Sequence, residues 1–252
     1  MSTPKTSLTI AAIGDLHCRK GSQGTFHPLF AQIAGQADVI VLCGDLTDLG
    51  LPEEAQILAK EIGSAVNVPV LAVLGNHDHE SGNPGEVVKI LAGAGITLLD
   101  GEAVEIHGVG FVGAKGFCGG FGRHTLEPWG EDILKRYVRE AVDETLRLES
   151  ALAKIRTPRR VAVLHYAPIE ATVEGEPREI YPFLGTSRLE DPLDRYEATV
   201  AFHGHAHRGS LEGKTRGGVP VFNVAMPLLR RSFPDRPPFK LYTVPVEPDG
   251  GA

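Results

Sequence analysis

Five short apolar runs are the feature of this sequence that most constrains its fold. Each run is continuous rather than alternating and is rich in Val, Ile and Leu, a pattern typical of strands buried on both faces in a sheet that helices cover. The runs are LTIAAIG (8–14), ADVIVLCG (37–44), VPVLAVLG (68–75), VAVLH (161–165) and ATVAFHG (198–204). They predict an α/β fold.

Helical patterns lie between the runs. Residues 52–65 start with Pro and two Glu, which suit a helix N-terminus, and residues 84–95 end in glycines, which suit a C-terminus. Residues 130–155 keep apolar side chains on one face and predict the longest helix. Four more strand-like segments predict a second sheet: 103–106, 109–112, 219–224 and 240–246.

The order of the segments predicts one domain over residues 1–252, because no repeat, linker or low-complexity segment divides the chain. We expect residues 1–7 to form a flexible N-terminal tail. Two stretches, 114–130 and 169–192, show no clear period and predict long loops, which in compact domains are usually functional or mobile.

Charge and cysteine content exclude several classes of protein. The net charge of −7 argues against binding nucleic acid chiefly through a basic surface. Three scattered cysteines are too few for a disulfide framework or a cysteine zinc cluster. Nothing in the sequence resembles a signal peptide or a membrane span, so we expect a cytoplasmic protein. The sequence leaves the oligomeric state open.

Polar residues that commonly bind metals follow each apolar run. Because ligands bind at the carboxyl ends of strands in open α/β sheets, we expect these residues to meet at one edge. Histidine nitrogens with Asp and Asn oxygens suit Mn, Fe, Zn or Co, and the spacings in D-x-H and H-x-H let one extended segment supply two ligands. The candidates are Asp15, His17, Asp45, Asp48, Asn76, His77, Asp78, His165, His203, His205 and His207.

Simpler roles exist for each of these residues taken alone. An aspartate after a strand often caps the next helix, and Asn76 could be a turn residue. We expect His203 to pack or hydrogen-bond behind the site and Asp78 to stabilise a turn or support a ligand. We expect His79 to be a solvated loop residue.

The motifs resemble one family. D-x-H, G-D-x-x-D, G-N-H-D, a lone strand-end His and G-H-x-H occur in this order over residues 15–207, as in the calcineurin-like metallophosphoesterases. The G-N-H-D version looks most like bacterial class III cyclic-nucleotide phosphodiesterases. The resemblance implies a four-layer αββα sandwich of two stacked mixed sheets flanked by helices. It also implies seven ligands for two ions: Asp15, His17 and His207 for one, Asn76, His165 and His205 for the other, and Asp45 as the bridge.

The resemblance further implies a catalytic role for His77, with Asp48 accepting a hydrogen bond from its ring. Two cations about 3.5–4 Å apart would polarise a bridging water, and the resulting hydroxide would attack phosphorus. A protonated His77 would then give a proton to the leaving alkoxide as general acid. An aspartate partner would keep the imidazole protonated.

The expected substrate is a small phosphate ester, more specifically a diester. Leu49 and Leu74 stand where protein phosphatases of this family carry arginines, so a dianionic monoester would lose two guanidinium partners. A phosphomonoesterase is the alternative, and a non-catalytic scaffold would be expected to lack some ligands. Arg123 and His124 are candidate substrate contacts in a loop that could equally be solvated. Residues 228–232 (LLRRS) could place a guanidinium near the phosphate or form a surface charge pair.

Overall fold

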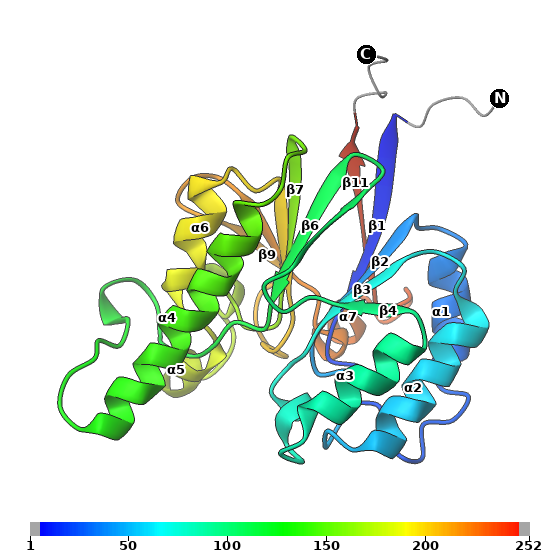
Figure 1. Ribbon diagram of the computed structural model, residues 1–252, viewed down its shortest axis with the longest axis horizontal. Coiled ribbons are helices and arrows are strands. Elements are labelled where there is room, and N and C mark those ends of the chain that lie inside the picture. Colours follow the sequence, from blue (N-terminus) through cyan, green and yellow to red (C-terminus); the bar gives the residue numbers. More distant parts are fainter. Residues whose placement is uncertain (1–5, 247–252) are drawn as a thin grey trace.

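Two β-sheets stack face to face in the computed structural model, which describes residues 6–246 (Figure 1). The first sheet has the strand order β11-β1-β2-β3-β4. Its first four strands in the chain run parallel, and β11 pairs antiparallel with β1. Its strands are β1 (Ser7–Ile13), β2 (Val39–Cys43), β3 (Val70–Val73), β4 (Ile96–Leu98) and β11 (Lys240–Pro245).

The second sheet has the order β5-β6-β7-β8-β10-β9, with parallel strands at its centre and an antiparallel strand at each edge. Both sheets are therefore mixed. The strands of the second sheet are β5 (Ala103–Ile106), β6 (Val109–Ala114), β7 (Arg159–Leu164), β8 (Val200–His203), β9 (Glu212–Lys214) and β10 (Pro220–Asn223).

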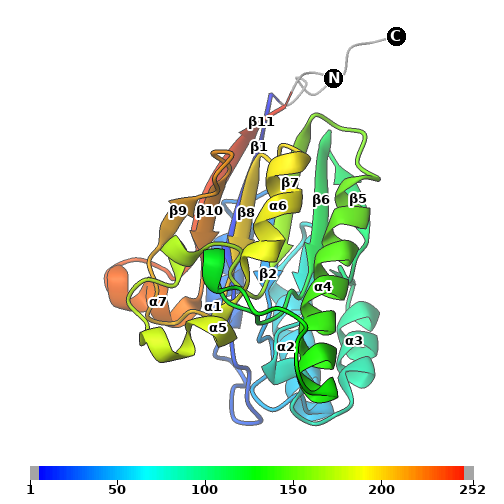
Figure 2. The same ribbon diagram turned by 90° about the vertical axis from the view of Figure 1, so that its left-hand side faces the viewer.

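Helices cover the outer face of each sheet. Helices α1, α2 and α3 pack on the first sheet, and α4 and α6 pack on the second, where Figure 2 shows them in front of β6, β7 and β8. The helices are α1 (His27–Ala34), α2 (Pro52–Ala65), α3 (Pro84–Gly93), α4 (Asp132–Leu152), α5 (Tyr181–Leu184), α6 (Glu190–Arg195) and α7 (Met226–Ser232).

Alternate side chains of each central strand enter different cores. In β1, Leu8 and Ile10 pack between the two sheets, whereas Ala11 and Ile13 pack under the helices. All four are fully buried. This double burial explains why the strands are continuously apolar in sequence, and it confirms the four-layer αββα sandwich.

The strands are divided between the two sheets differently from the sequence-based expectation, which put the five apolar runs in one sheet and the four other segments in a second. Strands β7 and β8, two of the five apolar runs, belong to the second sheet, and β11 belongs to the first. Segment 169–192 is not a structureless loop, because it folds into short helical turns around α5. Of the predicted tail 1–7, residues 1–5 lie outside the described residues, but Ser7 already opens β1.

Candidate metal centre

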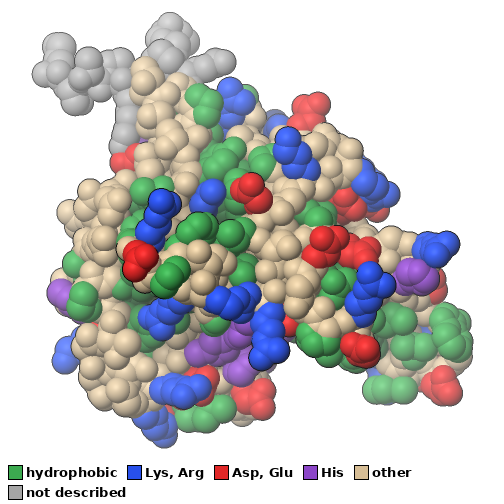
Figure 3. Space-filling model, turned by 180° about the vertical axis from the view of Figure 1, so that it is seen from behind, with side chains coloured by type: hydrophobic (Ala, Val, Ile, Leu, Met, Phe, Trp, Pro, Cys, Tyr) green, Lys and Arg blue, Asp and Glu red, His purple; other side chains and the backbone are tan. Residues whose placement is uncertain are grey.

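The metal-ligand candidates stand at the carboxyl ends of five strands, as expected. The turns after β1, β2 and β3 come from the first sheet, and those after β7 and β8 from the second. The stacking of the sheets brings these ends to one edge of the sandwich. Seen from the back of the molecule, histidine side chains gather in one patch with Lys and Arg side chains around it (Figure 3).

A first group consists of Asp15, His17, Asp45 and His207, each of which offers one ligand atom within 4.8 Å of the others. The Nε2 atom of His207 lies 2.8 Å from Asp15 Oδ1. Both ring nitrogens of His17 are buried without a hydrogen-bond partner among the described residues. Since a buried polar atom without a partner is costly, His17 fits a cation that its lone pair would bind.

A second group consists of Asp45, His165 and His205, again within 4.8 Å of one another. His165 donates from Nδ1 to the Cys43 carbonyl over 2.9 Å, which leaves a lone pair on Nε2. That Nε2 lies 2.9 Å from Oδ1 of Asn76. An imidazole lone pair beside an amide oxygen is an arrangement that a cation stabilises, so Asn76 fits this candidate group.

Asp45 belongs to both groups. Its Oδ2 lies 3.7 Å from Nε2 of His17, and its Oδ1 lies 3.4 Å from Nε2 of His165. The carboxylate is buried, and Oδ1 also accepts the backbone N–H of His77 over 2.9 Å. The two oxygens therefore face different groups, which is the placement that a bridging ligand requires.

Burial controls the protonation of the histidines. It lowers the pKa of His17 to about 4 and that of His205 to about 3, so both rings are neutral at pH 7 and their lone pairs can bind a metal. Burial raises the pKa of Asp45. Burial also opposes ionisation of Asp15, but the hydrogen bond with His207 and the nearby histidines outweigh it and lower its pKa.

The backbone is strained at four of the candidate ligands. Asp15, His17, Asp45 and His205 have φ values of 57°, 45°, 48° and 68°, a region that non-glycine residues rarely adopt. Such conformations persist where the surrounding structure enforces them, and they cluster at functional sites.

Two glycines leave room for the carboxylates. A Cβ on Gly75 would overlap the carboxylate of Asp45, and a Cβ on Gly204 would overlap that of Asp15. The glycines of G-N-H and G-H-x-H therefore have a direct steric role at this site.

His77 lies beside the first group, with its ring centroid 4.5 Å from that of His17. Its Nδ1 donates to Asp48 over 2.7 Å, but the acceptor is the main-chain carbonyl and not the expected carboxylate. The Asp48 carboxylate instead faces His17 Nδ1 at 3.5 Å and Arg19 Nε at 3.0 Å. The tautomer of His77 is thus fixed by the turn after β2 rather than by a charge.

Asp78 and His203 support the site from behind. The buried Asp78 carboxylate accepts the backbone N–H groups of Leu46, Thr47 and Gly75 and the Thr47 hydroxyl. The buried His203 ring contacts the hydroxyl of Thr172 and the carbonyl of Gly204. Both residues therefore have the supporting positions that we expected.

Three residues that the sequence did not single out, or left open, contact the ligands. The centroid of the Tyr166 ring lies 4.6 Å from that of the His205 ring. The carbonyl of Phe183 accepts a hydrogen bond from Nε2 of His205. Arg231, from the LLRRS segment, donates to the carbonyl of His207 over 3.0 Å. Only their place next to a ligand in the folded chain marks these residues.

The two candidate substrate contacts, Arg123 and His124, are exposed and hydrogen-bond to each other over 3.2 Å. No contact described for residues 6–246 joins either side chain to the ligand groups. The expected exposure of His79 is confirmed.

The fold and the ligand groups together define an α/β sandwich with a candidate two-metal centre at its strand ends. The model of the calcineurin-like phosphoesterase family matches residues 8–209, and the chain belongs to this family of metal-dependent phosphoester hydrolases. No curated protein sequence matches the chain. Among residues 6–246, no helix has the length and apolar character that a membrane span requires.

Solved structures show the same fold at low sequence identity. Phosphopantetheinyl hydrolase from Mycobacterium tuberculosis has a TM-score of 0.68 and 15% identity, over 94% of this chain and 96% of that one. TT1561 of Thermus thermophilus has a TM-score of 0.56 and 14% identity, over 96% and 100%. GAP50, described as the anchor in the inner membrane complex of Plasmodium, has a TM-score of 0.57 and 14% identity, over 88% and 73%.

Proposed function

We propose that the chain hydrolyses a phosphodiester with two metal ions drawn from Mn, Fe, Zn and Co. The observation that carries this proposal is Asp45, whose two carboxylate oxygens face different ligand groups. Asp15, His17 and His207 would hold one ion with Asp45, and Asn76, His165 and His205 would hold the other. When bound, the cations would neutralise phosphoryl oxygens and activate the attacking water.

His77 is the proposed general acid. Its Nδ1 is engaged by the Asp48 carbonyl, so Nε2 is the atom that can carry a proton to the leaving oxygen. Its position next to His17 supports this role, because such a proton would lie beside the first ligand group.

The shortage of free guanidinium groups near the site supports a diester over a dianionic monoester. Leu49 and Leu74 offer no charge, and Arg19 is paired with Asp48. Arg231 supports the alternative monoesterase, because it lies against the backbone of His207. The description of GAP50 as an anchor suggests a scaffold role. The two ligand groups argue against it, because a scaffold would not need to keep them.

The proposal is tested by Mn²⁺-dependent rates on bis(p-nitrophenyl) phosphate and p-nitrophenyl phosphate, with chelator-treated protein as the control. A preference for the diester supports the phosphodiesterase. A preference for the monoester that Arg231→Ala reduces would establish the alternative, with Arg231 holding the dianion. Absence of turnover on both esters with metals bound would contradict the proposed function.

A further inference from the structure

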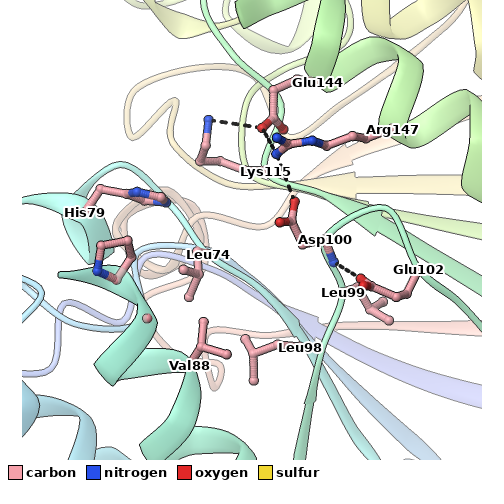
Figure 4. Close-up of a pocket in the computed structure, with 12 residues that line it drawn as sticks. Leu74, His79, Val88, Leu98, Leu99, Asp100, Glu102, Lys115, Glu144 and Arg147 are labelled. Carbon is pink, nitrogen blue, oxygen red and sulfur yellow. Dashed lines mark hydrogen bonds and ion pairs between the residues drawn. The ribbon is translucent and has the colours of Figure 1, made fainter. Parts of the chain in front are cut away.

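A cavity of about 370 Å³ lies between α3 and α4, and we call it the α3–α4 cavity (Figure 4). Leu74, Val88 and Leu98 give it an apolar floor, and charged side chains from α4 and from the ends of β4 and β6 form its rim. This volume falls within the range of about 300–1,000 Å³ that small-molecule sites occupy.

The charges on the rim are paired with one another. Lys115 Nζ lies 3.7 Å from Glu144, and Arg147 donates to Glu144 over 3.0 Å and to Asp100 over 3.3 Å. Glu102, the remaining charged residue of the lining, is a third carboxylate. Both cations thus already bind carboxylates and the acids outnumber them, which disfavours an anionic ligand and leaves the apolar floor as the main binding surface.

The cavity adjoins the second ligand group. Leu74 precedes Gly75 and Asn76 in the turn after β3. The carbonyl of Lys115 accepts the backbone N–H of His165 over 3.1 Å, and Lys115 Nζ lies 5.4 Å from the centroid of the Tyr166 ring. Tyr166 in turn packs on His205. The Tyr166 ring therefore contacts both the rim lysine and a candidate ligand.

We propose that the α3–α4 cavity binds one ester substituent of the substrate, and that this substituent is uncharged and largely apolar. The inference rests on the proposed function, since a phosphate at the ligand groups would present its ester group to the adjoining cavity. It assigns to residues of α3 and α4 a role in substrate selection.

The test uses two diesters with the same leaving group, methyl and hexyl p-nitrophenyl phosphate. Gly85 lines the cavity, and a Cβ there would meet nothing within 4 Å, so Gly85→Leu adds an apolar side chain to the cavity lining at a position with room for its Cβ. Gly93, at the other end of α3, also has open space around a Cβ and lies outside the cavity, so Gly93→Leu is the matched control.

We expect the wild-type protein to favour the hexyl ester by about tenfold or more in kcat/KM, chiefly through KM, because each buried methylene contributes roughly fourfold. Gly85→Leu is expected to reduce the hexyl-to-methyl ratio toward one, and Gly93→Leu is expected to keep the wild-type ratio. A ratio near one in the wild-type protein, or a ratio that Gly85→Leu does not change, would overturn the inference.

A binding measurement separates this inference from the proposed function. Hexyl and methyl methylphosphonate carry the same substituents but no p-nitrophenolate to release, and calorimetry measures their binding to the Mn²⁺-loaded protein. Tighter binding of the hexyl compound that Gly85→Leu abolishes would support the cavity even if neither ester is hydrolysed, which would contradict only the proposed function. Hydrolysis without any chain-length preference in rate or binding would contradict only the cavity assignment.

Discussion

At the scale of single residues, Asp45 connects the two halves of the candidate centre. It stands at the end of a strand of the first sheet, yet one of its oxygens faces His165 at the end of a strand of the second. Its positive φ and the space that Gly75 leaves show that the turn after β2 is built around this carboxylate.

Asp45→Asn is therefore expected to weaken the binding of both proposed metal ions, because the amide offers only one oxygen and no charge. Metal analysis after dialysis checks this expectation, with Asp132→Asn on the exposed start of α4 as the control. Two tightly bound ions in the Asp45 variant would contradict the bridging role.

His77→Ala is expected to keep its metals and to lose a factor of about 10²–10⁴ in kcat, the usual contribution of a general acid. Metal content and kcat are measured on the same sample, with the exposed His27→Ala as the control. Unchanged turnover would show that the leaving group needs no proton from His77.

At the scale of elements, Asp78 ties the turn after β2 to the turn after β3. Asp78→Asn keeps the shape but turns one acceptor atom into a donor against backbone N–H groups. The cost of such a mismatch is about 1–3 kcal/mol. We expect a lower Tm and a lower metal affinity than in the wild-type protein.

Thr47→Val is the milder comparison for Asp78→Asn, because it removes only the hydroxyl that donates to Asp78. Thermal unfolding with and without Mn²⁺ gives both quantities. If the Asp78→Asn variant has the Tm and the metal affinity of the wild-type protein, Asp78 does not hold the two turns together.

The strands, and the meeting of the candidate ligands at one edge, were predictable from sequence because continuous apolar runs and the polar residues after them are local features. The observed α2 has the expected bounds, and α3 and α4 end within three residues of theirs. The distribution of strands between sheets was not predictable, because a strand buried on both faces has the same pattern in either sheet. The short elements β4, β9 and α1 also lack a period long enough to recognise.

Some details of the site were beyond the sequence for a different reason. The acceptor for His77 is a main-chain carbonyl, and every residue carries one, so residue types could not reveal it. The contacts of Tyr166 and Arg231 with His205 and His207 depend on chain segments far apart in sequence.

At the scale of the whole molecule, the core between the sheets draws side chains from strands of both. Burial of three histidines at the strand ends makes the fold sensitive to acid. His203 and His17 have pKa values of about 4 and His205 one of about 3 in the folded chain. Unfolded histidines take up protons near pH 6.5, so acid favours the unfolded state between these values.

We therefore expect the Tm of the chelator-treated protein to fall steadily as the pH is lowered from 6.5 to 4. Each pKa unit between the folded and unfolded states corresponds to about 1.4 kcal/mol. His207 acts in the opposite sense, because its hydrogen bond with Asp15 outweighs burial and raises its pKa, but three histidines oppose it. A constant Tm over this range would contradict the account.

The antiparallel pairing of β11 with β1 has a consequence for synthesis on the ribosome. Every proposed ligand precedes residue 208, yet β1 gains its outer neighbour only when residues 240–245 have been made. A nascent or truncated chain that stops before Lys240 would carry the whole ligand set and still expose one edge of β1. Bare strand edges recruit other chains, so such fragments are expected to aggregate more readily than the full chain.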